Sequence, residues 1–213
     1  MNNIIEIKNV SKKFGDTMVL NDVHAAFSQG YIHGLIGRNG SGKTMLLKCI
    51  CGMIPISSGI IKVRNKIIGK EIDIPDKIGV IIETPGFLPE YSAYKNLKFL
   101  AEIRGGITRA DIESAIEKVG LDPKERKKVG KYSLGMRQRL GLAQAIMENP
   151  ELLILDEPMN GLDKEGVEDM RKYLLNLKKD GKTILIASHS AEDIDVLCDN
   201  VYEMERGRIK KIR

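Results

Sequence analysis

The segment that most constrains how this chain can fold is a glycine-rich run with an apolar segment before it and a helical pattern after it. The apolar segment is Ile32–Ile36; behind the run, Leu46, Leu47 and Ile50 recur at helical spacing, and Gly52 is the expected stop. The order predicts a buried strand, a tight turn and a helix. The run fits the pattern G-x-x-x-x-G-K-[ST] at every fixed position. It consists of Gly37, Arg38, Asn39, Gly40, Ser41, Gly42, Lys43 and Thr44.

The residue types of this run suit a phosphate group. Glycines let the backbone curl so that several N–H groups converge on phosphate oxygens, and the start of a helix favours the same anion. Lys43 adds a point charge, and the hydroxyl of Thr44 can bind Mg²⁺. A glycine turn with an incidental lysine is the alternative, which the strand and helix context disfavours.

A second apolar run, Leu152–Leu155, ends in two adjacent carboxylates, Asp156 and Glu157. In open α/β sheets, ligands bind at the carboxyl ends of the strands. Asp156 would help to hold a metal ion there, and Glu157 is placed to accept a proton from an attacking water. Such acids also begin ordinary helices, so the prediction depends on their coupling to the phosphate loop.

Short apolar runs alternate with helical patterns along much of the chain. Ile78–Ile82 and Thr183–Ala187 predict further buried strands, whereas Ile5–Lys8 and Val19–Val23 alternate and predict half-exposed antiparallel strands. The fold class is therefore α/β, with a mainly parallel sheet flanked by helices.

The stretch from residue 85 to residue 149 contains helical patterns and no convincing strand. These patterns cover Ala93–Arg104, Arg109–Val119 and Leu134–Met147. We expect a single domain over 1–213, in which 1–84 and 150–213 form the core and 85–149 a helical subdomain.

The composition is that of a globular protein, with 42% hydrophobic and 30% charged residues. Since no apolar stretch reaches the ~18 residues of a membrane span and the start lacks a secretory pattern, we expect a cytoplasmic chain. Cys49, Cys51 and Cys198 lack the paired spacing of a zinc site and are expected to be small buried residues.

The net charge of +5 comes partly from short basic runs such as Lys124–Lys128 and the tail Arg206–Lys211. Solvated helix faces and a solvated hairpin explain them, and attraction to an anionic inner membrane leaflet stays open. Neither run has interleaved aromatic residues for base stacking, so we expect no nucleic-acid partner.

A third motif lies shortly before the acidic strand, where Tyr132–Leu140 leads into a helix with a serine at its start. Here the chain resembles the ATPases of ABC transporters, whose signature loop reads Leu-Ser-Gly-Gly-Gln. Ser133 and Gly135 match this loop, whereas Leu134 and Met136 replace its first glycine and its glutamine.

The resemblance gives roles to residues elsewhere in the chain. Asp163 matches the D-loop aspartate, and His189 the switch histidine that contacts the γ-phosphate, while His24 and His33 are expected to be structural. Phe14 matches the aromatic that stacks on adenine, with a core position as the alternative.

One departure concerns the strand that ends at Ile82. Most members place a metal-contacting glutamine after it, whereas this chain has Glu83, so the resemblance implies a metal ligand with an added charge. This glutamate and the altered signature look similar to ATPases that export peptide antibiotics and drugs.

The resemblance implies a P-loop NTPase fold with an N-terminal antiparallel β-subdomain, and ATP and Mg²⁺ as ligands. ATP would contact the phosphate loop and the residue after it, from Gly37 to Met45. Lys43 and His189 would stabilise the developing charge, and Glu157 would activate water. A second ATPase subunit, identical or paralogous, would bind head to tail and present its signature residues Ser133–Met136. The expected location is the inner face of the cell membrane, attached through permease subunits.

Two other functions are weighed against transport. One is a soluble ABC ATPase acting on nucleic acid or ribosomes, although this chain lacks a second ATPase half or a long coiled coil. The other is a regulatory module with little turnover, which the presence of Glu157 and His189 disfavours. The residues past Glu83, namely Phe87, Leu88, Tyr91 and Tyr94, either contact the permease or form core of the helical insertion.

Overall fold

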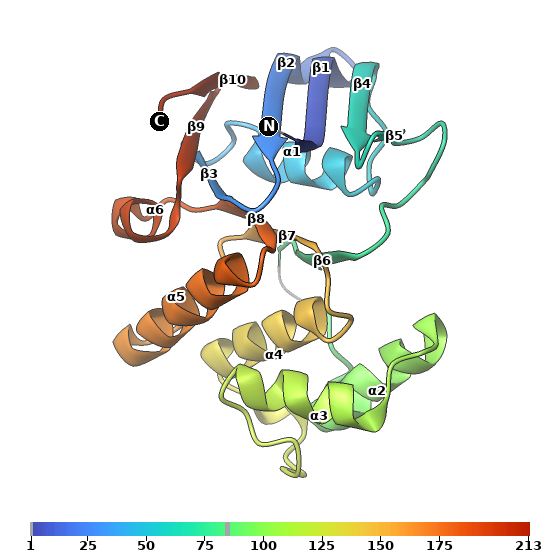
Figure 1. Ribbon diagram of the computed structural model, residues 1–213, viewed down its shortest axis with the longest axis vertical. Helices are drawn as coiled ribbons and strands as arrows, with labels where there is room; N and C mark the ends of the chain where they lie inside the picture. The colour runs from blue at the N-terminus through green and yellow to red at the C-terminus, as the bar shows by residue number, and fades with distance from the viewer. Residues whose placement is uncertain (1, 84–85) are drawn as a thin grey trace.

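Two sheets carry the fold in the computed structural model, which describes residues 2–83 and 86–213 (Figure 1). The four-stranded sheet has the order β2-β1-β4-β5, and its neighbouring strands are antiparallel. The six-stranded sheet has the order β10-β9-β3-β8-β7-β6, and only its β10 strand is antiparallel to its neighbour. The strands are β1 (Asn3–Phe14), β2 (Thr17–Ser28), β3 (Ile32–Ile36), β4 (Ser58–Val63), β5 (Lys66–Ile67), β6 (Ile78–Ile81), β7 (Leu152–Asp156), β8 (Thr183–Ala187), β9 (Asn200–Glu205) and β10 (Arg208–Lys211).

The parallel strands are apolar throughout because both faces of the larger sheet are covered. In β7, Leu153 and Leu155 join the core beneath the helical segment, whereas Leu152 and Ile154 join the core that contains α1 and the smaller sheet. Side chains of a strand alternate between the two faces, so a continuous apolar run is required here. The buried strands and the antiparallel pair predicted from the sequence are confirmed; β4, β5 and β9 were not predicted.

Helices surround the larger sheet, and those between β6 and β7 form a separate group below it in Figure 1. Local capping residues fix where these helices begin. The Ser92 hydroxyl accepts a hydrogen bond from the Lys95 backbone N–H, and Thr108 and Asp111 form a capping box. The helices are α1 (Lys43–Ile50), α2 (Ala93–Arg104), α3 (Arg109–Lys118), the 3₁₀ turn η1 (Val129–Lys131), α4 (Leu134–Ile146), α5 (Lys164–Lys179) and α6 (Ala191–Leu197).

The helical insertion contains α2, α3, η1 and α4, as its sequence pattern predicts. Its proposed first boundary falls on Thr84 and Pro85, which lie outside the described residues. The division into a core and a helical subdomain therefore stays a prediction.

The three cysteines are buried and free, as expected. Burial raises the pKa of Cys49 to about 11 and that of Cys198 to about 12, so both thiols stay protonated and unreactive near neutral pH. Within residues 2–83 and 86–213, no helix is long and apolar enough to cross a membrane.

His33 on β3 is a buried titratable residue beneath the smaller sheet. It is 1% exposed; its Nε2 lies 2.8 Å from the Ser28 carbonyl oxygen, and its buried Nδ1 has no hydrogen-bond partner. Burial lowers the pKa of His33 from 6.5, against the opposing effects of the Ser28 bond and Asp199, whereas Lys211 lowers it further. The neutral ring therefore suits the folded chain.

This lowered pKa predicts a loss of stability in mild acid. The folded chain binds fewer protons at His33 than the unfolded chain, so the stabilisation is complete above pH 6.5 and is lost as the pH falls below it. We expect the free energy of unfolding to fall by up to about 1.4 kcal/mol per pH unit there. Urea titrations should show a weaker dependence in His33→Gln, whereas the exposed control His24→Gln should keep it. Equal slopes in all three proteins would contradict this account.

Candidate functional site

Parallel pairing brings the ends of several strands to one edge of the larger sheet. Leu35 on β3 is paired with Ala187 on β8, and Ala187 with Asp156 on β7. The loops that leave these strands therefore begin side by side. They carry the phosphate loop, Glu157 and His189, which the sequence analysis had linked only through separate motifs.

The phosphate loop is bent by glycines and held by its own backbone. Gly42 precedes α1 with φ 109°, and the Ser41 N–H donates to the Arg38 carbonyl oxygen at 3.1 Å. Lys43 is nine-tenths buried, and its Nζ donates to the Gly37 carbonyl oxygen at 2.6 Å. The Ser41 hydroxyl is buried without a hydrogen-bond partner, as expected of a group that faces a ligand.

Two short contacts connect the acidic strand to the rest of the site. The Thr44 hydroxyl donates to Asp156 Oδ2 at 2.6 Å, which links the start of α1 to the end of β7. Glu157 Oε2 lies 2.7 Å from His189 Nδ1. Glu157 has φ 50°, a conformation that is uncommon for a residue with a side chain, and its N–H donates to the Ala187 carbonyl oxygen at 2.9 Å. The carboxylate is thus fixed beside the ring of His189.

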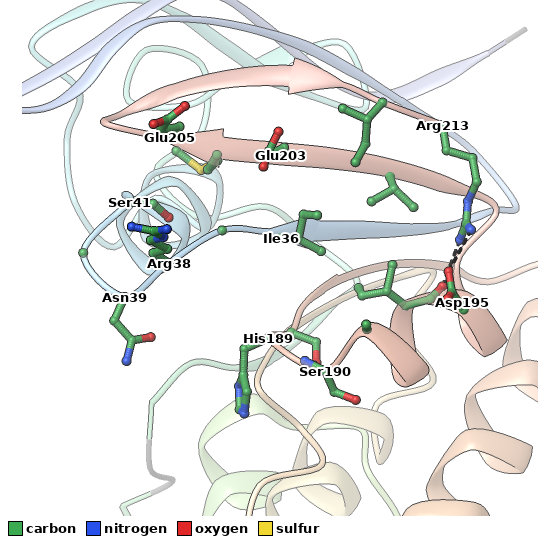
Figure 2. Close-up of a pocket in the computed structure, with 18 of the residues that line it drawn as sticks. Ile36, Arg38, Asn39, Ser41, His189, Ser190, Asp195, Glu203, Glu205 and Arg213 are labelled. Carbon is green, nitrogen blue, oxygen red and sulfur yellow. Dashed lines mark hydrogen bonds and ion pairs between the residues drawn. The ribbon is translucent and has the colours of Figure 1, made fainter.

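Two cavities open beside the phosphate loop. One, of about 400 Å³, is lined by residues 38–45 together with Val19, Asp156 and Glu157. The other, of about 980 Å³, lies between the phosphate loop, β9 and α6, and Figure 2 shows Asn39 and His189 among the side chains that line it. Both cavities are lined by residues 38–41, so the larger one continues the smaller one along the loop to His189.

The signature segment lies apart from these cavities. Ser133 caps α4 through its hydroxyl, which accepts from the Met136 N–H at 3.2 Å, and Leu134 is 58% exposed. Among the described residues that line either cavity, none belongs to Ser133–Met136. A methyl group at Gly135 would meet the Gly161 carbonyl oxygen at 2.9 Å, so the signature packs closely on the segment before Asp163.

Asp163 has a local structural role in the same segment. Its carboxylate accepts from the Gly166 N–H at 2.9 Å and so caps α5. Residues 160–163 and the signature are therefore next to each other within one chain, and neither segment is among the described residues that line the two cavities.

Two residues predicted for the site lie at its margin. Phe14 is 49% exposed, but Lys12 Nζ lies over its ring, 4.6 Å from the centroid, and Val19 rather than Phe14 lines the smaller cavity. Glu83 accepts a hydrogen bond from Lys48 Nζ at 2.6 Å. Sequence reasoning missed Val19, which lies on the predicted second strand, and Lys48, which falls one turn after Thr44 on the predicted helix.

Comparison with known proteins decides the family. A family model for the ABC transporter matches residues 20–160. The chain belongs to this family. It is an ATP-binding subunit of the ABC transporter kind and an ATPase.

Proteins similar to this ABC ATPase include two from bacteria. YybJ, an uncharacterised ABC transporter ATP-binding protein of Bacillus subtilis (strain 168), is 45% identical over 97% of this chain and 95% of its own length. The bacitracin transport ATP-binding protein BcrA of Enterococcus faecalis is 42% identical over 98% of this chain and 68% of its own length. A solved ATP-binding subunit of an ABC transporter has a TM-score of 0.87 at 26% identity, covering 98% of this chain and 89% of that one.

Two glycines of the phosphate loop should respond differently to a methyl group. At Gly37 (φ 148°) the methyl carbon would lie 2.3 Å from the Met204 carbonyl oxygen on β9, whereas at Gly40 (φ 78°) it would meet nothing within 4 Å. We expect Gly40→Ala to cost about 1 kcal/mol through backbone strain and Gly37→Ala about 3 kcal/mol or more. Urea unfolding without nucleotide measures both. Equal losses would show that the contact with β9 is unimportant.

Proposed function

We propose that this ABC ATPase powers transport through separate membrane subunits. It hydrolyses ATP only in sites that lie between two subunits, which are either two copies of this chain or this chain and a paralogue. The observation that carries this proposal is the separation within one chain of the phosphate loop and the signature segment. The cavities beside the phosphate loop contain no signature residue among their described lining, while Ser133 caps α4 with its neighbour Leu134 exposed. A head-to-tail partner can supply what each half lacks.

In the proposed half-site, residues 37–45 hold the triphosphate. The backbone N–H groups and the unpartnered Ser41 hydroxyl face the phosphate oxygens. Lys43 would exchange its bonds to the loop carbonyls for bonds to phosphate, since an ammonium group pairs better with an anion than with a peptide oxygen.

The residues present fit a magnesium ion. A hydroxyl and a carboxylate, those of Thr44 and Asp156, lie 2.6 Å apart beside the loop, and Mg²⁺ in such sites takes one or two protein oxygens together with phosphate oxygens and water. When bound, Mg²⁺ would neutralise charge on the phosphate oxygens. Thr44 and Asp156 would hold it.

Glu157 is the proposed general base. Its carboxylate lines the smaller cavity, and the 2.7 Å contact to His189 Nδ1 fixes the direction of its oxygens. Glu157 would accept a proton from the water that attacks the γ-phosphorus, and His189 would stabilise charge on the γ-phosphate. Ser133 of the second subunit would lie across the nucleotide and help to orient that phosphate.

The proposed transport role adds a membrane permease as a partner of this chain. BcrA, which is 42% identical to this chain, has bacitracin transport in its name, and this supports export of a peptide antibiotic or related drug. Beyond Glu83, Leu88 and Tyr91 are exposed, whereas Phe87 and Tyr94 pack partly against the core. We assign only the first pair to a surface for the permease. The chain would then be held at the inner face of the membrane.

Glu157→Gln tests the proposed chemistry. Loss of a general base costs about a hundredfold or more in rate, while the amide preserves size and leaves the phosphate loop unchanged. We expect steady-state hydrolysis to fall by at least about that factor, ATP binding to persist, and a dimer to accumulate in size-exclusion chromatography with ATP. Glu151→Gln, a change at a partly exposed residue just before β7, is the matched control and should hydrolyse normally. Undiminished turnover in Glu157→Gln would remove Glu157 as the base.

A further inference from the structure

Glu83 and Lys48 form an ion pair beside the proposed metal site. Lys48 Nζ lies 2.6 Å from Glu83 Oε1, with side-chain exposures of 22% for Lys48 and 64% for Glu83. Glu83 has φ 60°, so the chain turns sharply after β6 where it presents this carboxylate. The pair joins the helix behind the phosphate loop to the segment after β6.

The positions of both residues follow from helix and sheet geometry. Lys48 comes four residues after Thr44 on α1, so the two side chains lie on the same face of the helix, one turn apart. Ile81 on β6 is paired with Leu155 on the adjoining parallel strand β7. Glu83 therefore leaves β6 at the end of the sheet where Glu157 leaves β7. The ion pair and the Thr44–Asp156 hydrogen bond are neighbours along α1.

The charges at this end of the sheet explain why a lysine is needed. Asp156 and Glu157 already bring two carboxylates, and Glu83 adds a third where an amide would add no charge. Lys43 is occupied by the carbonyl oxygens of Gly37 and Arg38. Among the described residues, Lys48 is the cation within ion-pairing distance of Glu83. It offsets the added charge and holds the carboxylate on α1.

We infer that Lys48 is a positioning residue for Glu83. Lys48 holds the Glu83 carboxylate against α1, so this carboxylate reaches a bound Mg²⁺ only after the ion pair opens. The inference rests on the proposed Mg²⁺–ATP site. An exposed ion pair is weak, so ligand binding can open it, and the restraint on metal affinity should be about two- to fivefold. Lys48 thereby sets the Mg²⁺ concentration at which nucleotide binding tightens.

The test measures nucleotide binding and does not require turnover. A fluorescent ATP analogue is titrated at a series of free Mg²⁺ concentrations, and the Mg²⁺ concentration for half-maximal binding is recorded for the native chain, Lys48→Met, Lys48→Arg, Glu83→Gln and Lys48→Met/Glu83→Gln. We expect Lys48→Met to lower this concentration about two- to fivefold and Lys48→Arg to leave it nearly unchanged. In the Glu83→Gln background, Lys48→Met should have little effect, because no carboxylate remains to be released.

A matched control separates the pair from general charge effects. Lys77→Met removes a lysine that pairs with Glu151 at 2.8 Å near the opposite end of β6 and β7, and it should not change the Mg²⁺ dependence. Thermal melting of each variant checks the fold. An equal shift from Lys48→Met with and without Glu83, or no shift at all, overturns the role of Lys48. Absence of Mg²⁺-dependent ATP binding in the native chain overturns the proposed site itself.

Discussion

Parallel strand pairing is the constraint on which the rest of the site depends. One row of paired residues, Leu35, Ala187 and Asp156, crosses β3, β8 and β7 at the same end of the sheet. The phosphate loop, His189 and Glu157 follow this row directly, so no long side chain has to reach across the molecule. A slip of one residue in any strand would exchange its side chains between the two cores, whose packing they would no longer fit, and would also separate these groups. Burial of the strands on both faces thus fixes the geometry of the site.

The same sheet leaves the signature segment at a distance from the phosphate loop. Ser133 caps α4, which belongs to the helical group between β6 and β7, and Gly135 packs against Gly161 of its own chain. A single chain consequently presents two different surfaces, one rich in phosphate-binding groups and one that carries Ser133. Association of two chains head to tail would bring these surfaces together twice. In this account, ATP is the ligand that joins them.

The sequence predicts the parts of this fold whose burial is complete. Thr183–Ala187 is buried at every position, so its apolar run matches β8 without ambiguity. In contrast, β9 has two consecutive buried residues, Val201 and Tyr202, before exposed Glu203, which breaks the alternation, and it was not predicted although it lies beside β3 in the sheet. The short β4 strand begins with the exposed residues Ser58 and Gly59 and gives a weak pattern.

The contacts of the site also include some that the sequence predicts and some that it does not. Motifs with fixed spacing predicted the phosphate loop and the two acids, and the structure places them together. The ion pair between Lys48 and Glu83 joins residues 35 positions apart, and no local pattern indicates it. The hydrogen bond between Thr44 and Asp156 spans 112 positions, yet it was predictable in outline because both residues belong to motifs that bind the same ligand. Long-range contacts outside motifs required the structure.

The central claim is that each hydrolytic site is built from two chains, and mixing two inactive variants tests it most directly. Lys43→Ala removes the phosphate-loop cation, and Ser133→Arg blocks the signature surface, so each protein alone should hydrolyse ATP at no more than about a hundredth of the native rate. A mixed dimer restores one intact site, formed by the Lys43 of one chain and the Ser133 of the other. ATPase activity should therefore return on mixing. Mixed samples that stay inactive while heterodimers form, or a Ser133→Arg monomer with normal activity, would contradict the shared site.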